Sequence, residues 1–239
     1  MGKGSLTPPP SPILKNSLAR VRMAEAAERD AEILVTLTKF VRVLTIPQIA
    51  RTWWATAKNP AGATEQHLRS LVAEGLLDIE RAPAHPEIEL KAPVLSWGLD
   101  QPNPEFGPVS YKLQSRWTFH PELTPCVSAT RKAANRFGGY ASRPPRQVER
   151  THDIHMGQVF LFYRANEPEL LKFWVFEEQI KAERKRARTE SSHGVKLPDA
   201  ILRAPAGTRV VEFGGAYSKE KLQAFHAYCK ENHFPYEVW

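Results

Sequence analysis

Two short runs in the second half of the chain constrain the fold most. Residues 173–176 read FWVF and residues 209–214 read RVVEFG, so neither run alternates cleanly between apolar and polar side chains. A strand with one face in water alternates, whereas a strand covered by helices on both faces is apolar on both sides. We therefore predict a sheet in this part of the chain with a helical layer on each face.

The segments around these runs complete one folding unit. Two strands separated by about four loop residues form a hairpin, and a strand that follows a crossover helix pairs in parallel within the same sheet. The resulting order is αβββαβ. Its predicted elements are a helix at 152–165, strands at 171–176, 199–203 and 209–214, a helix at 218–232 and a strand at 236–239.

The first half of the chain has a helical pattern. Apolar residues at 25–41 recur with the spacing of an amphipathic helix. Thr45 is a good N-cap for a second helix, whose first turn suits a proline. A third helix is predicted at 64–74, capped by Thr64 and closed by Gly75.

Strand-like segments follow the third helix. Residues 76–80 form the first candidate, and residues 94–99 and 110–119 form two more. Three helices followed by a β-hairpin is the order of a winged helix-turn-helix. The sequence thus predicts an α+β protein of two domains: a flexible tail at 1–24, a winged helix-turn-helix domain at 25–120, a basic linker at 121–150 and an αβββαβ domain at 151–239.

Positive charge is concentrated in the second half. The chain carries +7 at pH 7. Residues 1–130 hold 14 basic and 13 acidic side chains, while residues 131–239 hold 19 and 13. This excess favours a polyanionic partner such as DNA. Candidate DNA contacts are Gln66 and Arg69 on the third helix, then Arg131, Lys132, Arg136, Arg143, Arg146, Lys181, Arg184, Lys185, Arg186 and Arg188.

Each of these candidates has an alternative interpretation. The third helix either reads a DNA groove or docks a protein, since Arg69 is its only certain cation. The basic linker either lies on a phosphate backbone or is a solvated tether. The tract at 181–188 is either a phosphate clamp or the charged face of a helix.

Two carboxylates are predicted to meet on the sheet. If Arg203 pairs with Thr208 across the hairpin, Asp199 lies opposite Glu212 on the same face. Two like charges there are destabilising unless a cation lies between them, and Mg²⁺ or Mn²⁺ is the cation that oxygen ligands favour. A register shift of one residue would send the two side chains to opposite faces.

These features together resemble a known superfamily. The αβββαβ order, Asp199 at the start of one strand and Glu212 in the next resemble the PD-(D/E)xK nuclease-like superfamily, which has a restriction-endonuclease-like core. With a winged helix in front, residues 30–239 are similar to the plasmid replication-relaxation family, whose members are linked to plasmid replication, DNA relaxation and mobilisation. The motifs that carry this resemblance are His152, Trp174, Glu177 or Glu178, Pro198-Asp199-Ala200, Val211-Glu212, Lys221 and Tyr228.

The chain departs from the superfamily pattern at one catalytic position. That pattern has a lysine two residues after the glutamate, where this chain has Gly214. The ammonium stabilises the attacking water and the developing charge, which glycine cannot do. Lys221, one turn into the next helix, is a candidate for a displaced lysine, or else an ordinary solvated residue. Glu177 or Glu178 is a candidate third metal ligand, or else a surface acid at a strand end.

The resemblance implies a DNA-binding accessory protein of a plasmid or mobile element, with a degenerate nuclease-like domain. One alternative is a Mg²⁺-dependent or Mn²⁺-dependent DNA endonuclease that uses Asp199, Glu212 and Lys221. A second alternative is a scaffold that docks other replication, mobilisation or nuclease subunits or a second copy of itself. No run is long enough for a membrane span and no signal peptide is recognisable, so a cytoplasmic protein is expected. His152 and His155 are expected to cap or pack rather than to bind metal.

Overall fold

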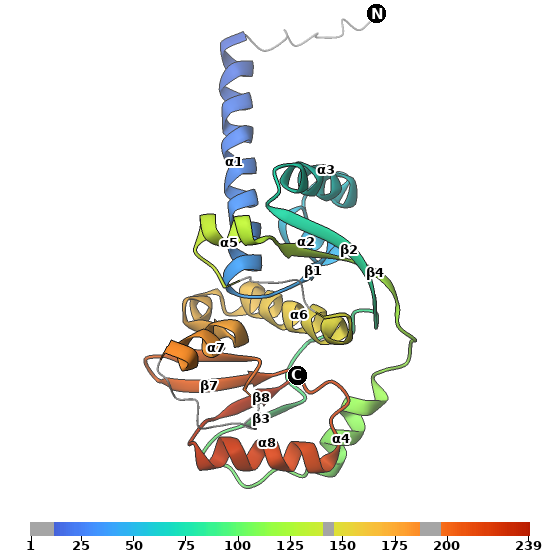
Figure 1. Cartoon of the computed structure of the whole chain (residues 1–239), viewed down its shortest axis with the longest axis vertical. Coiled ribbons are helices and arrows are strands. Elements are labelled where there is room, and N and C mark those ends of the chain that lie inside the picture. Colours follow the sequence, from blue (N-terminus) through green and yellow to red (C-terminus); the bar gives the residue numbers. More distant parts are fainter. Residues whose placement is uncertain (1–11, 141–145, 187–196) are drawn as a thin grey trace, which may run out of the picture.

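The computed structural model describes residues 12–140, 146–186 and 197–239. Within these ranges the chain is a mixed α+β protein with two β-sheets, as the sequence predicts (Figure 1). One sheet has three strands in the order β1-β4-β2, and the other has five in the order β3-β8-β7-β6-β5. Among the described residues, no helix is both long enough and apolar enough to span a membrane.

The three-stranded sheet is built by the first 130 residues. Its strands are β1 (Leu44–Thr45), β2 (Leu77–Ala84) and β4 (Glu122–Ala129), and β4 pairs antiparallel with both neighbours. The helices that pack on it are α1 (Pro12–Lys39), α2 (Ile46–Trp53) and α3 (Pro60–Ala73).

Local capping explains where these helices begin. Thr45 caps α2 as predicted, and Gln48 completes a capping box with it. The start predicted for the third helix is wrong. Asn59 caps α3 and Pro60 occupies its first turn, while Thr64 is buried inside the helix. Gly75 follows the helix with a φ of 68°, a conformation that glycine adopts without a steric penalty.

Helix α1 begins at Pro12, so residues 12–24 of the predicted tail are helical. The segment from Leu18 to Arg29 is rich in Ala, Arg, Glu and Leu, which have the highest helix propensities. That preference extends the helix beyond its buried residues, which begin with Ile33. In Figure 1 the first turns of α1 project away from the rest of the molecule. Residues 1–11 lie outside the described residues.

Two of the predicted strands behave differently from the prediction. Residues 110–119 do not form a strand, because helix α4 (Phe106–Ser115) occupies most of this range and buries Leu113. Strand β3 (Leu95–Trp97) is a strand, but it pairs with β8 in the other sheet. The predicted hairpin is therefore formed by β2 and β4. The local sequence of 110–119 favours a strand, but the helix is the conformation that packs against α8.

The segment predicted as a linker is largely structured. It contains β4, helix α5 (Arg131–Phe137) and a short 3-10 helix η1 (Gln147–Glu149). Thr130 caps α5, and Gly138 ends it in the left-handed conformation. Helix α5 contacts α1. The proline pair that suggested a linker lies at 144–145, outside the described residues.

The five-stranded sheet contains the predicted αβββαβ order. Strands β5, β6 and β7 are antiparallel, and β7 pairs in parallel with β8 after the crossover helix. The segment between β5 and β6, which includes the basic tract at 181–186, contains an additional helix, α7. The bounds are α6 (Arg150–Asn166), η2 (Pro168–Phe173), β5 (Trp174–Phe176), α7 (Glu177–Arg186), β6 (Ala200–Ala204), β7 (Gly207–Glu212), α8 (Lys219–Glu231) and β8 (Tyr236–Val238).

Helix α6 lies between the two sheets (Figure 1). Its residues Val159 and Phe160 belong to one apolar core that includes Leu44 and Val127 on the first sheet and Val211 on the second. Helix α8 covers the opposite face of the five-stranded sheet with a separate core. Both faces of the five-stranded sheet are therefore covered, as the two apolar runs predict.

Candidate functional site

A cleft of about 920 Å³ lies at the end of strands β6 and β7. Several parts of the chain line it. Most lining residues come from η1 and the start of α6, from the turn between β7 and α8, and from the segment between β2 and β4. Arg42, Glu177 and Asp199 line it from other parts of the chain. The segment between β2 and β4 reaches across from the first sheet, so the cleft depends on both halves of the chain.

The predicted hairpin register is confirmed, because Arg203 pairs with Thr208. The same register brings Asp199 beside Glu212, and the Asp199 backbone N–H donates to Glu212 Oε2 at 3.3 Å. Both residues are buried. Asp199 lines the cleft, whereas Glu212 is not one of its lining residues. The register thus brings the Glu212 carboxylate to the main chain of Asp199, and of these two residues only Asp199 borders the cleft.

Asp199 forms an ion pair with His152 on α6. His152 Nε2 lies 2.8 Å from Asp199 Oδ2, and the Phe213 backbone N–H donates to the same oxygen at 2.9 Å. Burial disfavours the imidazolium, but the charge of Asp199 and hydrogen bonds to Asp153 and Asp199 outweigh it and raise the pKa of His152 to about 10. At neutral pH His152 is therefore a cation held between two carboxylates.

Glu212 is held by different partners. Besides the Asp199 backbone N–H, its Oε1 accepts a hydrogen bond from the Tyr217 hydroxyl. Burial, followed by the charge of Glu212, raises the pKa of Tyr217 well above its ordinary value, so the hydroxyl keeps its proton and remains a donor. The carboxylate is thus stabilised inside the fold by neutral donors.

His155, one turn further along α6, has the opposite environment. Its ring stacks on Phe213 at 5.0 Å, Nδ1 donates to the Thr151 carbonyl at 2.6 Å, and Nε2 accepts from the Ile88 N–H at 3.3 Å. Burial lowers the pKa of His155 to about 4. His155 is therefore a neutral packing residue, as the sequence predicts, whereas His152 belongs to the cleft.

The two positions proposed for a lysine differ in the space they offer. A Cβ on Gly214 would lie 2.7 Å from Val238 Cγ1 and 2.9 Å from Leu113 Cδ1, so any side chain there would force the core to move. Lys221 lines the same cleft as Asp199, and its Nζ lies 3.7 Å from the centroid of the Tyr217 ring. The displaced lysine of the sequence prediction thus reaches the cleft, while position 214 must remain small.

Glu177 and Glu178, the candidate third ligands, are paired with cations at the start of α7. Arg42 Nη2 donates to Glu177 Oε2 at 2.6 Å, and Lys181 Nζ lies 3.0 Å from the same oxygen and 3.1 Å from Glu178 Oε1. Arg42 also pairs with Asp153. Burial disfavours the charge on Arg42, but these carboxylates outweigh it and raise its pKa.

This set of residues does not fit a divalent metal ion. Asp199 Oδ2 is already paired with His152, and Glu177 Oε2 is already paired with Arg42. Within the described part of the chain, no three His, Cys, Asp or Glu side chains are grouped so that they could hold a metal ion.

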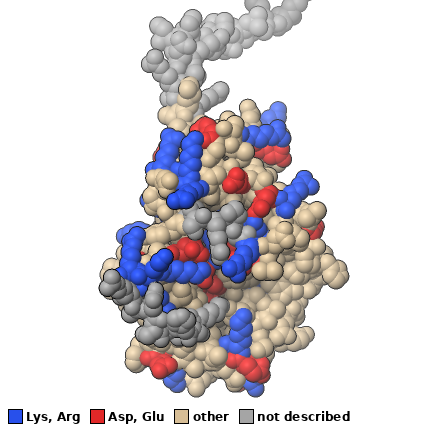
Figure 2. Space-filling view, viewed as in Figure 1, with Lys and Arg blue, Asp and Glu red and all other residues tan. Residues whose placement is uncertain are grey.

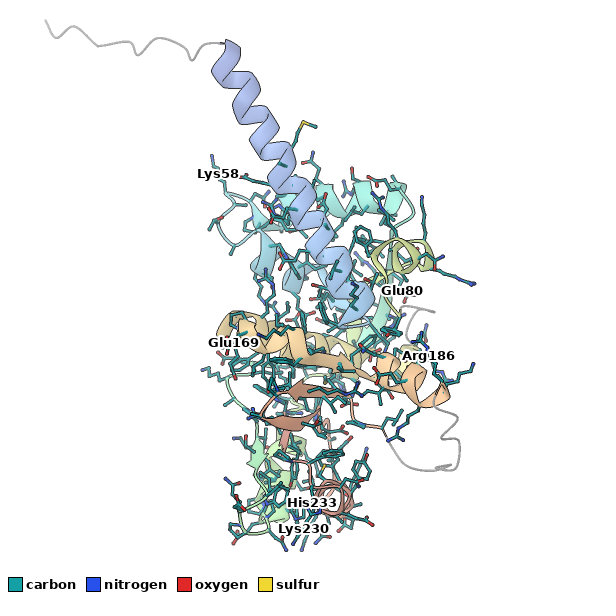
Figure 3. The ribbon with its side chains drawn as sticks, turned by 90° about the vertical axis from the view of Figure 1, so that its left-hand side faces the viewer. Lys58, Glu80, Glu169, Arg186, Lys230 and His233 are labelled. Atoms are coloured by element: carbon teal, nitrogen blue, oxygen red, sulfur yellow. The ribbon has the colours of Figure 1, made fainter. Side chains whose placement is uncertain are left out.

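The predicted DNA contacts are exposed on two short helices. Arg131, Lys132 and Arg136 are exposed on α5, and Lys181, Lys185 and Arg186 are exposed on α7. We call these six residues the basic surface. Figure 2 shows Lys and Arg side chains gathered over α5 and α7 on one face, and Figure 3 shows Arg186 at the outer end of α7. Arg184 is half-buried on α7 and Arg146 is exposed before η1, while Arg143 and Arg188 lie outside the described residues.

Helix α3 presents a weaker surface. Gln66 and Arg69 are exposed on it, but Arg69 forms an ion pair with Glu65 one turn earlier at 3.2 Å. The exposed face is therefore close to electrically neutral. The structure does not bring α3 residues into the cleft.

Sequence reasoning did not single out Arg42 or Trp117, which both line the cleft. Arg42 lies in a loop far along the chain from the acids it pairs with, and nothing in the sequence links them. Trp117 lies in the range predicted as a strand and instead follows α4 at the cleft wall. His152 is a motif residue of the sequence prediction with an expected capping or packing role, and only the fold shows its ion pair with Asp199.

Comparison with known proteins yields no relative. No family model, no curated protein and no solved structure matches the chain.

Proposed function

We propose that the chain is a DNA-binding accessory protein of a plasmid or mobile element, acting in replication, relaxation or mobilisation without cutting DNA itself. The observation that carries the proposal is the basic surface on α5 and α7. Exposed Lys and Arg side chains on neighbouring helices contact successive phosphates and gain affinity as counterions are released. The association with plasmids rests on the sequence resemblance alone.

The first half supports a winged helix-turn-helix identity. Its order is helix, short strand, two helices and two long paired strands, with β2 and β4 as the wing. The segment at 85–121 is then an insertion at the tip of the wing. Because α3 is nearly neutral, we propose that it contributes shape and orientation, and that most of the phosphate contacts come from the basic surface.

The cleft supports a nuclease-like domain that has lost its chemistry. The superfamily arrangement requires two carboxylates that are free to hold a metal ion and a lysine two positions later. Here a protonated His152 is paired with Asp199, and position 214 has no room for a side chain. A cation supplied by the protein thus stabilises the acidic pair that a metal ion would otherwise stabilise.

A gel-shift series tests DNA binding. We expect the affinity for duplex DNA to fall steeply between low and physiological salt, by a factor of at least about 100. Replacing Arg131, Lys132, Lys185 and Arg186 by glutamine should weaken binding to all duplex sequences alike. The matched control replaces four exposed lysines outside the basic surface by glutamine, which changes the net charge by the same amount. These are Lys58, Lys91, Lys112 and Lys219. Equal losses in both variants would contradict the proposal.

The active endonuclease remains a second candidate because Lys221 lines the cleft. Supercoiled plasmid with Mg²⁺ or Mn²⁺ distinguishes the two. Our proposal expects no nicking above the background of a Lys221→Gln variant. Nicking by the wild type that Lys221→Gln removes would establish the endonuclease instead. Binding that does not depend on salt would favour the protein scaffold.

A further inference from the structure

One apolar side chain is exposed at the border of the cleft. Val148 on η1 lines it and is 90% exposed. His85 also lines the cleft, and its Nδ1 lies 2.7 Å from the carbonyl oxygen of Phe119. The apolar surface of Val148 is therefore available to a ligand at the opening.

The inside of the cleft is lined by aromatic rings. Trp117 forms one wall and contacts His85, with ring centroids 4.9 Å apart, and Phe213 at 6.1 Å. Tyr217 lines the opposite part beneath Lys221. Aromatic side chains provide stacking surfaces for nucleobases, and such stacking does not depend strongly on which base is bound.

The charges around the cleft balance. Arg42, His152 and Lys221 contribute three positive charges, and Glu149, Glu177 and Asp199 contribute three negative charges. A phosphate group placed here would meet carboxylates as well as cations. A nucleobase is neutral, and its amino and carbonyl groups can use acceptors and donors equally. The cleft is therefore better suited to a base than to the phosphate backbone.

The cleft also borders the basic surface. Glu177, the first residue of α7, lines it, and Lys181 Nζ of the basic surface lies 3.0 Å from Glu177 Oε2. A DNA strand whose phosphates lie along α7 would thus pass the opening. The cleft volume of about 920 Å³ is large enough for a base with its sugar.

We propose that the cleft takes up one unpaired or extruded DNA base, which stacks on Trp117, while Val148 contacts the neighbouring base at the opening. This inference rests on the proposed DNA-binding function. Proteins that open a base step insert apolar side chains into it, and extruded bases are held between aromatic or apolar side chains. An already unpaired base avoids the cost of opening the pair, so it should bind better.

The test uses the full chain and short duplexes with 2-aminopurine at one position, either paired or opposite a mismatch. We expect about tenfold tighter binding of the mismatched duplex, and a change in 2-aminopurine fluorescence on binding. Trp117→Ala should remove most of the preference for the mismatched duplex, and circular dichroism checks that the variant is folded. Tyr111→Ala is the matched control, because Tyr111 is a 76% exposed aromatic residue of the same insertion that does not line the cleft.

A second variant tests the opening of the cleft. Val148→Asn should weaken binding of the mismatched duplex more than binding of the paired duplex, and because Val148 is 90% exposed the change should not disturb the fold. Equal affinity for both duplexes and unchanged fluorescence would overturn the base-binding inference while leaving the DNA-binding proposal intact. Failure to bind any DNA at low salt would overturn both. Equal effects of Trp117→Ala and Tyr111→Ala would also overturn the base-binding inference.

Discussion

The five-stranded sheet has two sites with buried carboxylates, one on β8 and one at the ends of β6 and β7. Both are stabilised by hydrogen bonds and ion pairs, but only one of them borders the cleft. On β8, Glu237 accepts from the Tyr163 hydroxyl at 2.6 Å, the Trp239 indole at 3.1 Å and Arg209 at 2.9 Å. At the ends of β6 and β7, Asp199 and Glu212 use a histidine and a tyrosine instead. The first site is a closed structural contact, and the second opens into the cleft.

The two sites differ in their place in the sheet. Glu237 lies within β8, between β3 and β7, and does not line the cleft. Asp199 lies just before β6, at the strand end, and lines the cleft. Both carboxylates are about equally buried, at 8% exposed for Asp199 and 9% for Glu237. His152, the partner of Asp199, keeps about a third of its side-chain surface exposed, so solvent reaches the Asp199 site through its partner.

The largest effect expected from this comparison is that of His152→Ala. It leaves the buried Asp199 carboxylate without its cation, and removing one partner of a buried ion pair costs about 3 kcal/mol or more. Because water reaches His152, we expect a loss of about 2 to 3 kcal/mol in the free energy of unfolding. Urea denaturation measures it, with His120→Ala as the exposed control. A loss no larger than that of the control would mean that the pair contributes nothing.

The pH dependence of stability should follow the two histidines. The pKa of His152 is raised to about 10, so its contribution is complete below pH 6.5 and is lost as the pH rises towards 10. The pKa of His155 is lowered to about 4, so its contribution is complete above pH 6.5 and is lost as the pH falls towards 4.

Stability should therefore be greatest near pH 6.5. Between pH 6.5 and about 8, before unfolded thiols and phenols ionise, the loss on the alkaline side should not exceed that caused by His152→Ala. Unfolding experiments across this range measure it. His152→Gln should flatten the alkaline side only. An alkaline loss that persists unchanged in His152→Gln would contradict the assignment.

A smaller loss is expected for Gly214→Ala, at the position next to the cleft where the superfamily pattern has a lysine. The new Cβ would press on Val238 and Leu113, which are both fully buried, and overpacking of this kind costs about 1 to 3 kcal/mol. Gly107→Ala is the control, because a Cβ there meets nothing within 4 Å. If both variants were equally stable, the cleft edge could accept a side chain and a lost lysine would no longer be a structural necessity.

The smallest effect is expected at the sealed site. Tyr163→Phe removes one donor to Glu237, but Arg209 and Trp239 remain, so the loss should be about 1 kcal/mol. DNA affinity should not change, since Glu237 does not line the cleft. A loss as large as that of His152→Ala would show that the two sites are equally dependent on a single partner.

The sequence alone determined four of the five strands of the larger sheet, β5, β6, β7 and β8. Residues 173–176 and 209–214 are apolar on both sides, and this local property already requires two covering layers. The hairpin register followed from a short loop, which allows few pairings, so Asp199 and Glu212 could be brought together before the structure was known. The cap at Thr45 was equally local.

Only the tertiary structure decided how the cleft is built. The pairing of β3 with β8 joins residues more than a hundred positions apart, and no local pattern specifies such a partner. The same holds for Arg42 with Glu177, for Trp117 at the cleft wall and for His152 with Asp199. Short-range periodicity determines whether a segment is a helix or a strand. Which segments pack together depends on the whole chain, and the cleft is formed by contacts between segments that are distant in sequence.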